Sequence, residues 1–132
     1  MTSYAYLDSE VVSDDSDPRN EGRTVVDTPK HSFSMLSRYT FENGNFLNGT
    51  TLGAGVTYSG VMFPESRFNR RFAQTDKNTI ANLFISKAFS LNNGSEIFTQ
   101  VNFDNIFDEK GISRAHMWVE PQEVKFTVRY SY

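Results

Sequence analysis

The two histidines of this sequence, His31 and His116, are the side chains best suited to bind a metal ion. The chain contains no cysteine, and no carboxylate stands at a spacing from either histidine that would complete a metal site. We therefore expect structural roles for both and neither a metal nor a cofactor. No nucleophile–base pair, carboxylate dyad or phosphate-binding loop is apparent, so we do not expect an enzyme.

An acidic run at Asp14, Asp15 and Asp17 has part of the composition of a calcium-binding loop. It lacks the regular ligand spacing and the closing glutamate of such a loop. We interpret it as a solvated loop. Weak calcium binding, or ions that bridge to lipopolysaccharide, remain the alternative.

Three arginines, Arg67, Arg70 and Arg71, lie close to two phenylalanines, Phe68 and Phe72. Basic residues interleaved with aromatic ones can bind nucleic acid, but the net charge of -3 does not favour such a partner. A solvated loop is our first interpretation, and contact with an anionic ligand or with lipopolysaccharide phosphate is the alternative.

The elements that position these residues are β-strands, because apolar and polar residues alternate with period two and turn residues separate the segments. We expect six strands, at about 2–8, 31–42, 50–62, 79–90, 96–106 and 122–132. Helix-period apolar faces are absent. The longest uninterrupted apolar run, from Tyr4 to Leu7, is far shorter than the roughly 20 residues of a transmembrane helix.

Four of these strands have one face without any charged residue. Its members are Phe33, Met35, Ser37, Tyr39, Phe41, Leu52, Ala54, Val56, Tyr58, Ile97, Thr99, Val101, Phe103, Val124, Phe126, Val128, Tyr130 and Tyr132. The opposite face is polar and carries Arg38, Lys125 and Arg129, which would line a lumen. The fourth strand places Lys87 on the apolar face near one end, where its ammonium can reach the membrane interface.

Short connections alternate with long ones, as in bacterial outer-membrane barrels. The short ones, around 42–48 and 91–95, contain Asn-Gly pairs that suit tight turns. The long ones, around 9–29, 63–78 and 107–121, hold most of the charges. Aromatic residues gather near strand ends. These features favour an all-β, antiparallel, up-and-down transmembrane β-barrel segment over a soluble sandwich or a lipocalin-like barrel that binds a small ligand.

Six strands are too few to close a barrel, since closed single-chain barrels of this class begin at about eight strands. Unpaired sheet edges are costly in hydrocarbon. We therefore expect either an incomplete barrel that belongs to a larger one or a protomer of an oligomeric passive or adhesive barrel. No signal peptide precedes the first strand, so we expect the N-terminal part of an exported protein to be missing from this chain.

Five motifs give the chain a family resemblance. They are Ser3-Tyr4-Ala5-Tyr6-Leu7-Asp8, Thr28-Pro29-Lys30-His31-Ser32-Phe33-Ser34, Leu52-Gly53-Ala54-Gly55-Val56-Thr57-Tyr58, Val101-Asn102-Phe103-Asp104-Asn105-Ile106-Phe107-Asp108 and Glu120-Pro121. The motifs occur in the order in which the family has them. With them the chain resembles the C-terminal β-barrel portion of TonB-dependent outer-membrane receptors of the siderophore-receptor type. Gln122 departs from the usual arginine, and the segment 67–78 lacks a common Leu-Pro-Gly-Tyr step.

The resemblance implies that residues 1–132 supply the last six strands of a barrel of about 22 strands around a plugged lumen. It implies import of a ferric siderophore or a similar bulky nutrient, with a metal chelate as substrate. It also implies a location in the bacterial outer membrane, among lipid and lipopolysaccharide. Contact with TonB would occur only through an N-terminal plug region that this chain lacks, together with the signal peptide.

The last strand has a second interpretation besides facing lipid. Its residues Val124, Phe126, Val128, Tyr130 and Tyr132 resemble the C-terminal signal that the barrel-assembly machinery recognises. Recognition would occur by addition of this strand to an open sheet edge. The sequence identifies no ligand-binding residue.

Overall fold

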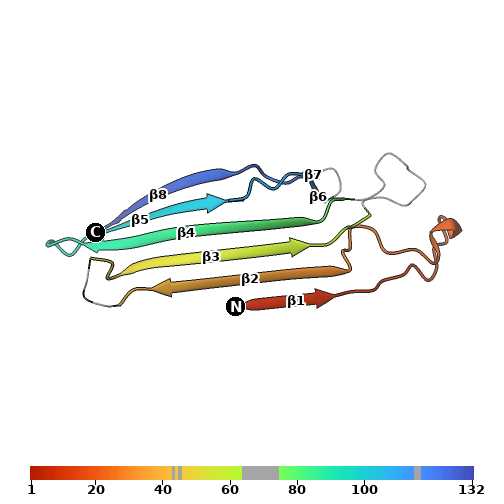
Figure 1. The fold of residues 1–132 in the computed structure, drawn as a ribbon, viewed down its shortest axis with the longest axis horizontal. Helices are drawn as coiled ribbons and strands as arrows, with labels where there is room; N and C mark the ends of the chain where they lie inside the picture. The colour runs from red at the N-terminus through yellow and green to blue at the C-terminus, as the bar shows by residue number, and fades with distance from the viewer. Residues whose placement is uncertain (43, 45, 64–74, 115–116) are drawn as a thin grey trace.

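The computed structural model describes residues 1–42, 44, 46–63, 75–114 and 117–132. Within these residues, six strands form one antiparallel sheet in the order β1-β2-β3-β4-β5-β8 (Figure 1). Their bounds are β1 (Thr2–Tyr6), β2 (His31–Thr40), β3 (Thr50–Ser59), β4 (Asn78–Ser90), β5 (Glu96–Asp104) and β8 (Glu123–Ser131). The predicted all-β, up-and-down, incomplete barrel segment is confirmed.

The long connections contain small elements that the sequence did not predict. One turn of 3₁₀ helix, η1 (Pro18–Asn20), lies between β1 and β2. A short hairpin of β6 (Ile112–Arg114) and β7 (Met117–Trp118) lies between β5 and β8. Both are too short for their periodicity to be recognised, because a period needs several repeats to stand out.

The register of the sheet confirms the two predicted faces. Directly paired residues of an antiparallel sheet have side chains on the same side. Val101 pairs with Ile85 on β4 and with Phe126 on β8, and Met35 pairs with Val56. The apolar residues of neighbouring strands thus form one continuous surface, which we call the apolar face. We call the opposite surface the polar face.

The sheet is a single layer, so neither face is covered by a second one. Among the described residues, the hydrophobic side chains that are less than one-tenth exposed are Met62 and Val119, both outside the strands. Phe126 is 68% exposed and Tyr39 is 61% exposed. A continuous apolar surface of this extent is unstable in water, so it requires lipid or another apolar partner.

Among the described residues, the structure has no helix of the length and hydropathy needed to span a membrane.

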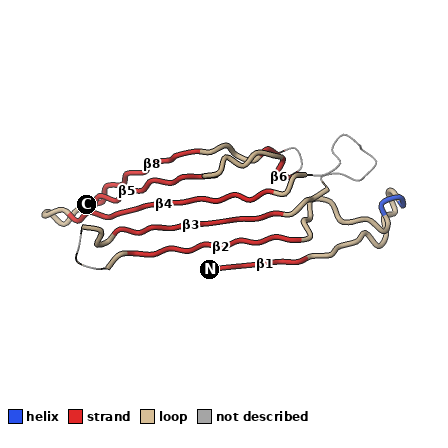
Figure 2. The backbone as a smooth tube through the Cα atoms, in the orientation of Figure 1, coloured by secondary structure: helices blue, strands red, loops and turns tan. Residues whose placement is uncertain are grey.

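The connections differ in length at the two ends of the sheet (Figure 2). The short ones lie at the end where the C-terminus lies, and they turn through glycines with positive φ, at Gly49 (75°) and Gly94 (84°). This conformation is open to glycine because it lacks a Cβ. The pairs Asn48-Gly49 and Asn93-Gly94 therefore lie in turns between neighbouring strands, and Asn43 of the third pair lies outside the described residues. We call this end the short-turn end and the opposite one the long-loop end.

One glycine of β3, on the polar face, is covered by an aromatic ring of the next strand. A Cβ at Gly53 would lie 2.0 Å from the ring of Phe84, which pairs with it in register. Such cross-strand cover replaces the packing that glycine lacks. It gives Phe84 a packing role on the polar face, which also carries the large apolar residues Leu36 and Phe98.

Candidate functional site

Aromatic side chains border the apolar face at both ends. At the short-turn end, the ring centroids of Tyr39 and Phe41 are 5.0 Å apart, and those of Tyr130 and Tyr132 are 6.2 Å apart. At the long-loop end, Tyr4 and Tyr6 lie against His31. Tyrosine is favoured at the boundary between lipid and water because its ring is apolar and its hydroxyl is polar. The two belts therefore mark the edges of a membrane-spanning band.

His31 belongs to the belt at the long-loop end. Its Nδ1 lies 2.9 Å from the Tyr4 hydroxyl, and its ring centroid lies 5.0 Å from that of Tyr6. Among the described residues, no group of three or more histidine, cysteine or acidic side chains is arranged to hold a metal ion. The described contacts of His31 are with the tyrosines of this belt. His116 lies outside the described residues.

The three basic residues predicted to face the lumen, Arg38, Lys125 and Arg129, all lie on the polar face, and their contacts differ. Lys125 pairs with Asp104 and Glu123, with Nζ–O distances of 3.0 Å to each. The guanidinium of Arg129 lies 5.0 Å from the ring centroid of Phe98. Arg38 is exposed on the same face. Lys125 and Arg129 are therefore engaged within the sheet, and the structure does not gather the three into one binding site.

The hairpin β6–β7 lies over the polar face near the long-loop end. Its residues Ser113 and Met117 line two hollows. The larger one, about 600 Å³, is also lined by hydroxyl residues of β1, β2 and β3, such as Ser32, Ser34 and Thr57, and by the large side chains of Tyr4, Phe33, Tyr58 and Met62. The smaller one, about 430 Å³, adjoins β4 and β5.

The side chain of Asn105 holds the base of this loop. Its Nδ2 donates to the carbonyls of Glu109 and Glu120, both at 2.9 Å, and its Oδ1 accepts from the Glu109 amide at 2.8 Å. Its own amide donates to the Asn82 side chain at 2.8 Å. Asn105 is 2% exposed and has a φ of 50°. These contacts fix the direction in which the chain leaves β5, and so the position of the hairpin.

Asp27 is a candidate functional residue that the sequence did not indicate. It lines the larger hollow and has a φ of 54°. Its Oδ1 is buried and has no hydrogen-bond partner among the described residues. A buried carboxylate oxygen without a partner is unfavourable, so a ligand or a further protein segment would stabilise it. No periodicity or motif around Asp27 distinguishes it from the other aspartates of the loop.

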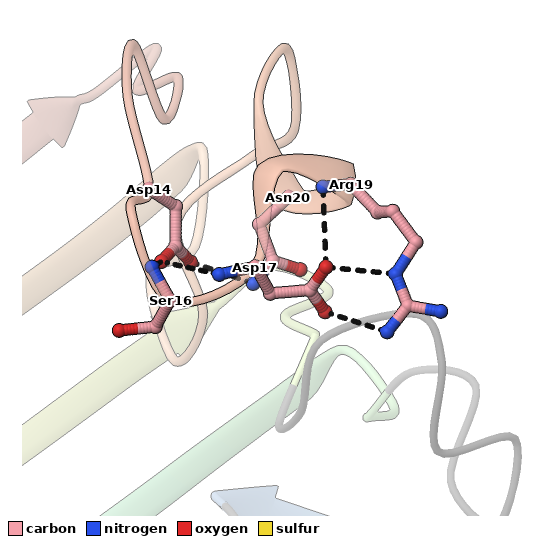
Figure 3. A network of polar contacts seen from close by, with 5 residues as sticks. All are labelled: Asp14, Ser16, Asp17, Arg19 and Asn20. Atoms are coloured by element: carbon pink, nitrogen blue, oxygen red, sulfur yellow. Dashed lines mark hydrogen bonds and ion pairs between the residues drawn. The ribbon is translucent and has the colours of Figure 1, made fainter.

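Hydrogen bonds between neighbouring side chains and amides order the acidic run as a loop (Figure 3). Asp14 accepts from the amides of Ser16 and Asp17, and from Asn20 Nδ2 at 2.7 Å. Asp17 accepts from the Arg19 guanidinium at 2.7 Å and from the Arg19 amide at 3.2 Å. Hydrogen bonds from Asn20 and from the Asp17 amide lower the pKa of Asp14, and the Arg19 guanidinium lowers the pKa of Asp17. The carboxylates thus order the loop, which agrees with our first interpretation.

The arginine cluster lies outside the described residues. This applies to Arg67, Arg70 and Arg71 and to the neighbouring Phe68 and Phe72. An anionic ligand at this cluster stays a prediction.

The last strand, β8, is at an edge of the sheet. Its apolar-face residues are exposed, from 54% at Tyr130 to 68% at Phe126, and Tyr132 is fully exposed. The Tyr130 hydroxyl donates to the Ser95 side chain at 2.9 Å, which ties β8 to the last short turn. Four residues of the predicted assembly signal therefore lie along one side of an edge strand, and the fifth, Tyr132, follows it directly. Their recognition by the assembly machinery stays a prediction.

A one-layer antiparallel sheet with an apolar face between aromatic belts and a polar opposite face is the wall of a transmembrane β-barrel. No family model matches the sequence. The chain is 31% identical over 125 residues to the metal-pseudopaline receptor CntO of Pseudomonas aeruginosa (strain UCBPP-PA14), which covers 92% of the chain and 16% of that receptor. It is 41% identical over 61 residues to the ferrichrome outer membrane transporter/phage receptor of Escherichia coli (strain K12), which covers 46% of the chain and 8% of that protein.

The relatives of this chain are TonB-dependent outer-membrane receptors, which it matches over part of their length. It lies in the bacterial outer membrane. The comparisons favour this location over the soluble alternative. The chain spans only about one sixth of the length of the receptor that it matches along most of its own sequence, at 16%.

Proposed function

We propose that the chain forms the last six strands of the barrel of an outer-membrane receptor that imports a metal chelate such as a ferric siderophore. The observation that carries this proposal is the match of 92% of the chain to a metal-pseudopaline receptor. The open edges at β1 and β8 support a place in a larger barrel, since backbone groups at an edge must be paired within a membrane. The plug domain, the TonB contact and the signal peptide would lie outside this chain.

Within this function, the larger hollow is the part of the chain that a substrate arriving from outside would meet. It lies at the long-loop end, which faces outward in bacterial barrels. Hydroxyl groups line it, and Asp27 adds a carboxylate oxygen without a hydrogen-bond partner among the described residues. Such a surface suits a polar, donor-rich ligand or a polar surface of the plug.

The transport activity can be tested in a strain that lacks the receptor. The complete receptor should restore uptake of a radiolabelled metal chelate, and dissipation of the inner-membrane proton gradient should stop that uptake. A passive oligomeric barrel would continue to admit the chelate without the gradient. That result would contradict the proposal.

The role of the hollow can be tested with matched substitutions in one loop. Asp27→Asn should raise the chelate concentration that gives half-maximal uptake, because it removes the unpaired carboxylate. Asp15→Asn, at an exposed position of the same loop, should leave that concentration unchanged. Equal effects of the two substitutions would rule out a role for the hollow and leave the transport assignment standing.

A further inference from the structure

Lys87 is the only Asp, Glu, Lys or Arg residue on the apolar face of the described strands. It pairs in register with Thr50 on β3 and with Thr99 on β5. Its Nζ donates to the carbonyl of Phe46 at 2.6 Å and lies 5.5 Å from the ring centroid of Phe89. The turn between β2 and β3 thus holds the ammonium at the short-turn end, and its reach to the membrane interface stays a prediction.

An open hollow of about 300 Å³ surrounds this lysine. Apolar side chains form its walls: Phe46 and Leu47 from the short turn, and Ile85 and Val101 from β4 and β5. Thr50 and Thr99 flank Lys87 on the same face. Phe46 is 84% exposed, so it is a projecting wall and not a core residue. The hollow therefore combines one cation with an apolar channel on the lipid side of the sheet.

The ammonium is not neutralised within the described residues, because no ion pair there includes Lys87. Its one hydrogen bond to Phe46 leaves N–H groups available. A cation at the border of hydrocarbon is costly unless an anion or water approaches it. The anion that a membrane supplies at this depth is the phosphate of a lipid.

We propose that this hollow binds an anionic phospholipid of the periplasmic leaflet. The phosphate would accept hydrogen bonds from Lys87 Nζ, and one acyl chain would lie along Phe46, Ile85 and Val101. The leaflet follows from orientation, because short turns face the periplasm in bacterial outer-membrane barrels. This proposal depends on the membrane location of the sheet and not on transport. Lipid binding and chelate import can therefore fail independently.

The test uses native mass spectrometry of the complete receptor in detergent, titrated with phosphatidylglycerol. The receptor should retain phosphatidylglycerol more tightly than diacylglycerol with the same chains, a comparison that needs no variant. Lys87→Gln should weaken binding about fivefold, as expected for one basic residue at a membrane surface. Lys87→Arg should bind nearly as well as the parent, and Phe46→Ala should bind less well because the wall is lost.

Lys110→Gln is the matched control, because Lys110 is an exposed lysine of the last long loop, outside the strands. It should leave phosphatidylglycerol binding unchanged. Equal retention of phosphatidylglycerol and diacylglycerol, or equal binding by Lys87→Gln and the parent, would overturn the proposal. So would displacement of the lipid by inorganic phosphate alone, or a Lys87-dependent preference for lipopolysaccharide, which occupies the other leaflet.

Discussion

At the scale of single residues, the side chain of Asn105 is important for the last long loop, although the sequence did not indicate this role. Its side chain makes three hydrogen bonds within the last long loop while its backbone is left-handed. Asn105→Ala should destabilise this loop by about 2–3 kcal/mol, since it removes those bonds and disfavours the conformation. Asn105→Gly should cost less, because glycine adopts a positive φ without strain.

The measurement is the rate of proteolysis within residues 105–122 of the assembled receptor. Cleavage should be fastest in Asn105→Ala, intermediate in Asn105→Gly and slowest in the parent. If alanine and glycine gave the same rate, the left-handed backbone would contribute nothing.

The sequence indicated the neighbourhood of Asn105 but not its role. The motif that contains it pointed to the family. Neither strand periodicity nor turn residues predict which backbone carbonyls a side chain will hydrogen-bond. The same holds for Asp27. Partners such as Glu120 lie many residues away along the loop, and their proximity depends on how the hairpin folds over the sheet. Alternation predicts which side of a strand a residue faces, and it carries no information on loop contacts.

Protonation of the acidic loop gives a second residue-scale prediction. The folded-state pKa values of Asp14 and Asp17 lie below the ordinary value of 3.8. Their carboxylates therefore stabilise the folded loop at pH above 3.8, and this contribution is lost as the pH falls through the lowered pKa values. Hydrogen–deuterium exchange of the amides of residues 14–17, 19 and 20, corrected for intrinsic rates, should accelerate below about pH 4.

Asp17→Asn tests the cause of this pH dependence, because an amide cannot form the ion pair with Arg19. The variant should exchange faster at neutral pH and show a smaller acceleration in acid. Asp15→Asn is the control and should behave as the parent does. A parent loop whose exchange did not change with pH would show that the two carboxylates do not hold it.

At the scale of elements, alternation was sufficient to locate all six long strands, and it failed for η1 and for the hairpin β6–β7. The ends of the observed strands differ from the predicted ends by up to three residues. The segment predicted at 50–62 pairs only as far as Ser59, because Gly60 already donates to the His31 carbonyl in the connection that follows. The element of greatest functional interest is β8, an edge strand that the exposed Tyr132 follows directly.

Tyr132→Ser distinguishes recognition of the C-terminus by the assembly machinery from a contribution of this residue to the stability of the assembled barrel. Tyr132 is fully exposed, so its loss should change the unfolding midpoint of the assembled barrel little. If the assembly machinery recognises the aromatic end, the amount of folded receptor in the outer membrane should fall severalfold, and Tyr132→Phe should restore it. A normal level of folded Tyr132→Ser would mean that these residues only face lipid.

At the scale of the whole molecule, the sheet is stable only if the membrane covers one face and water or protein covers the other. Two adjacent residues of β5 test this division. Val101 lies on the apolar face between Ile85 and Phe126, and Gln100 lies on the polar face between Ser86 and Thr127. Val101→Lys should reduce the free energy of unfolding by about 2–4 kcal/mol, because a charge near the bilayer centre is costly. Gln100→Lys should change it by less than about 1 kcal/mol, since lumenal charges are tolerated.

Urea unfolding of the complete receptor in lipid bilayers measures both values. The two variants carry the same new side chain on the same strand, one residue apart, so they differ only in the face that receives the charge. Equal losses would show that both faces meet similar surroundings, as in an oligomer that buries the apolar face against protein. A larger loss at Gln100 would reverse the faces, and with them the lumenal place of the hairpin and the lipid-facing place of Lys87.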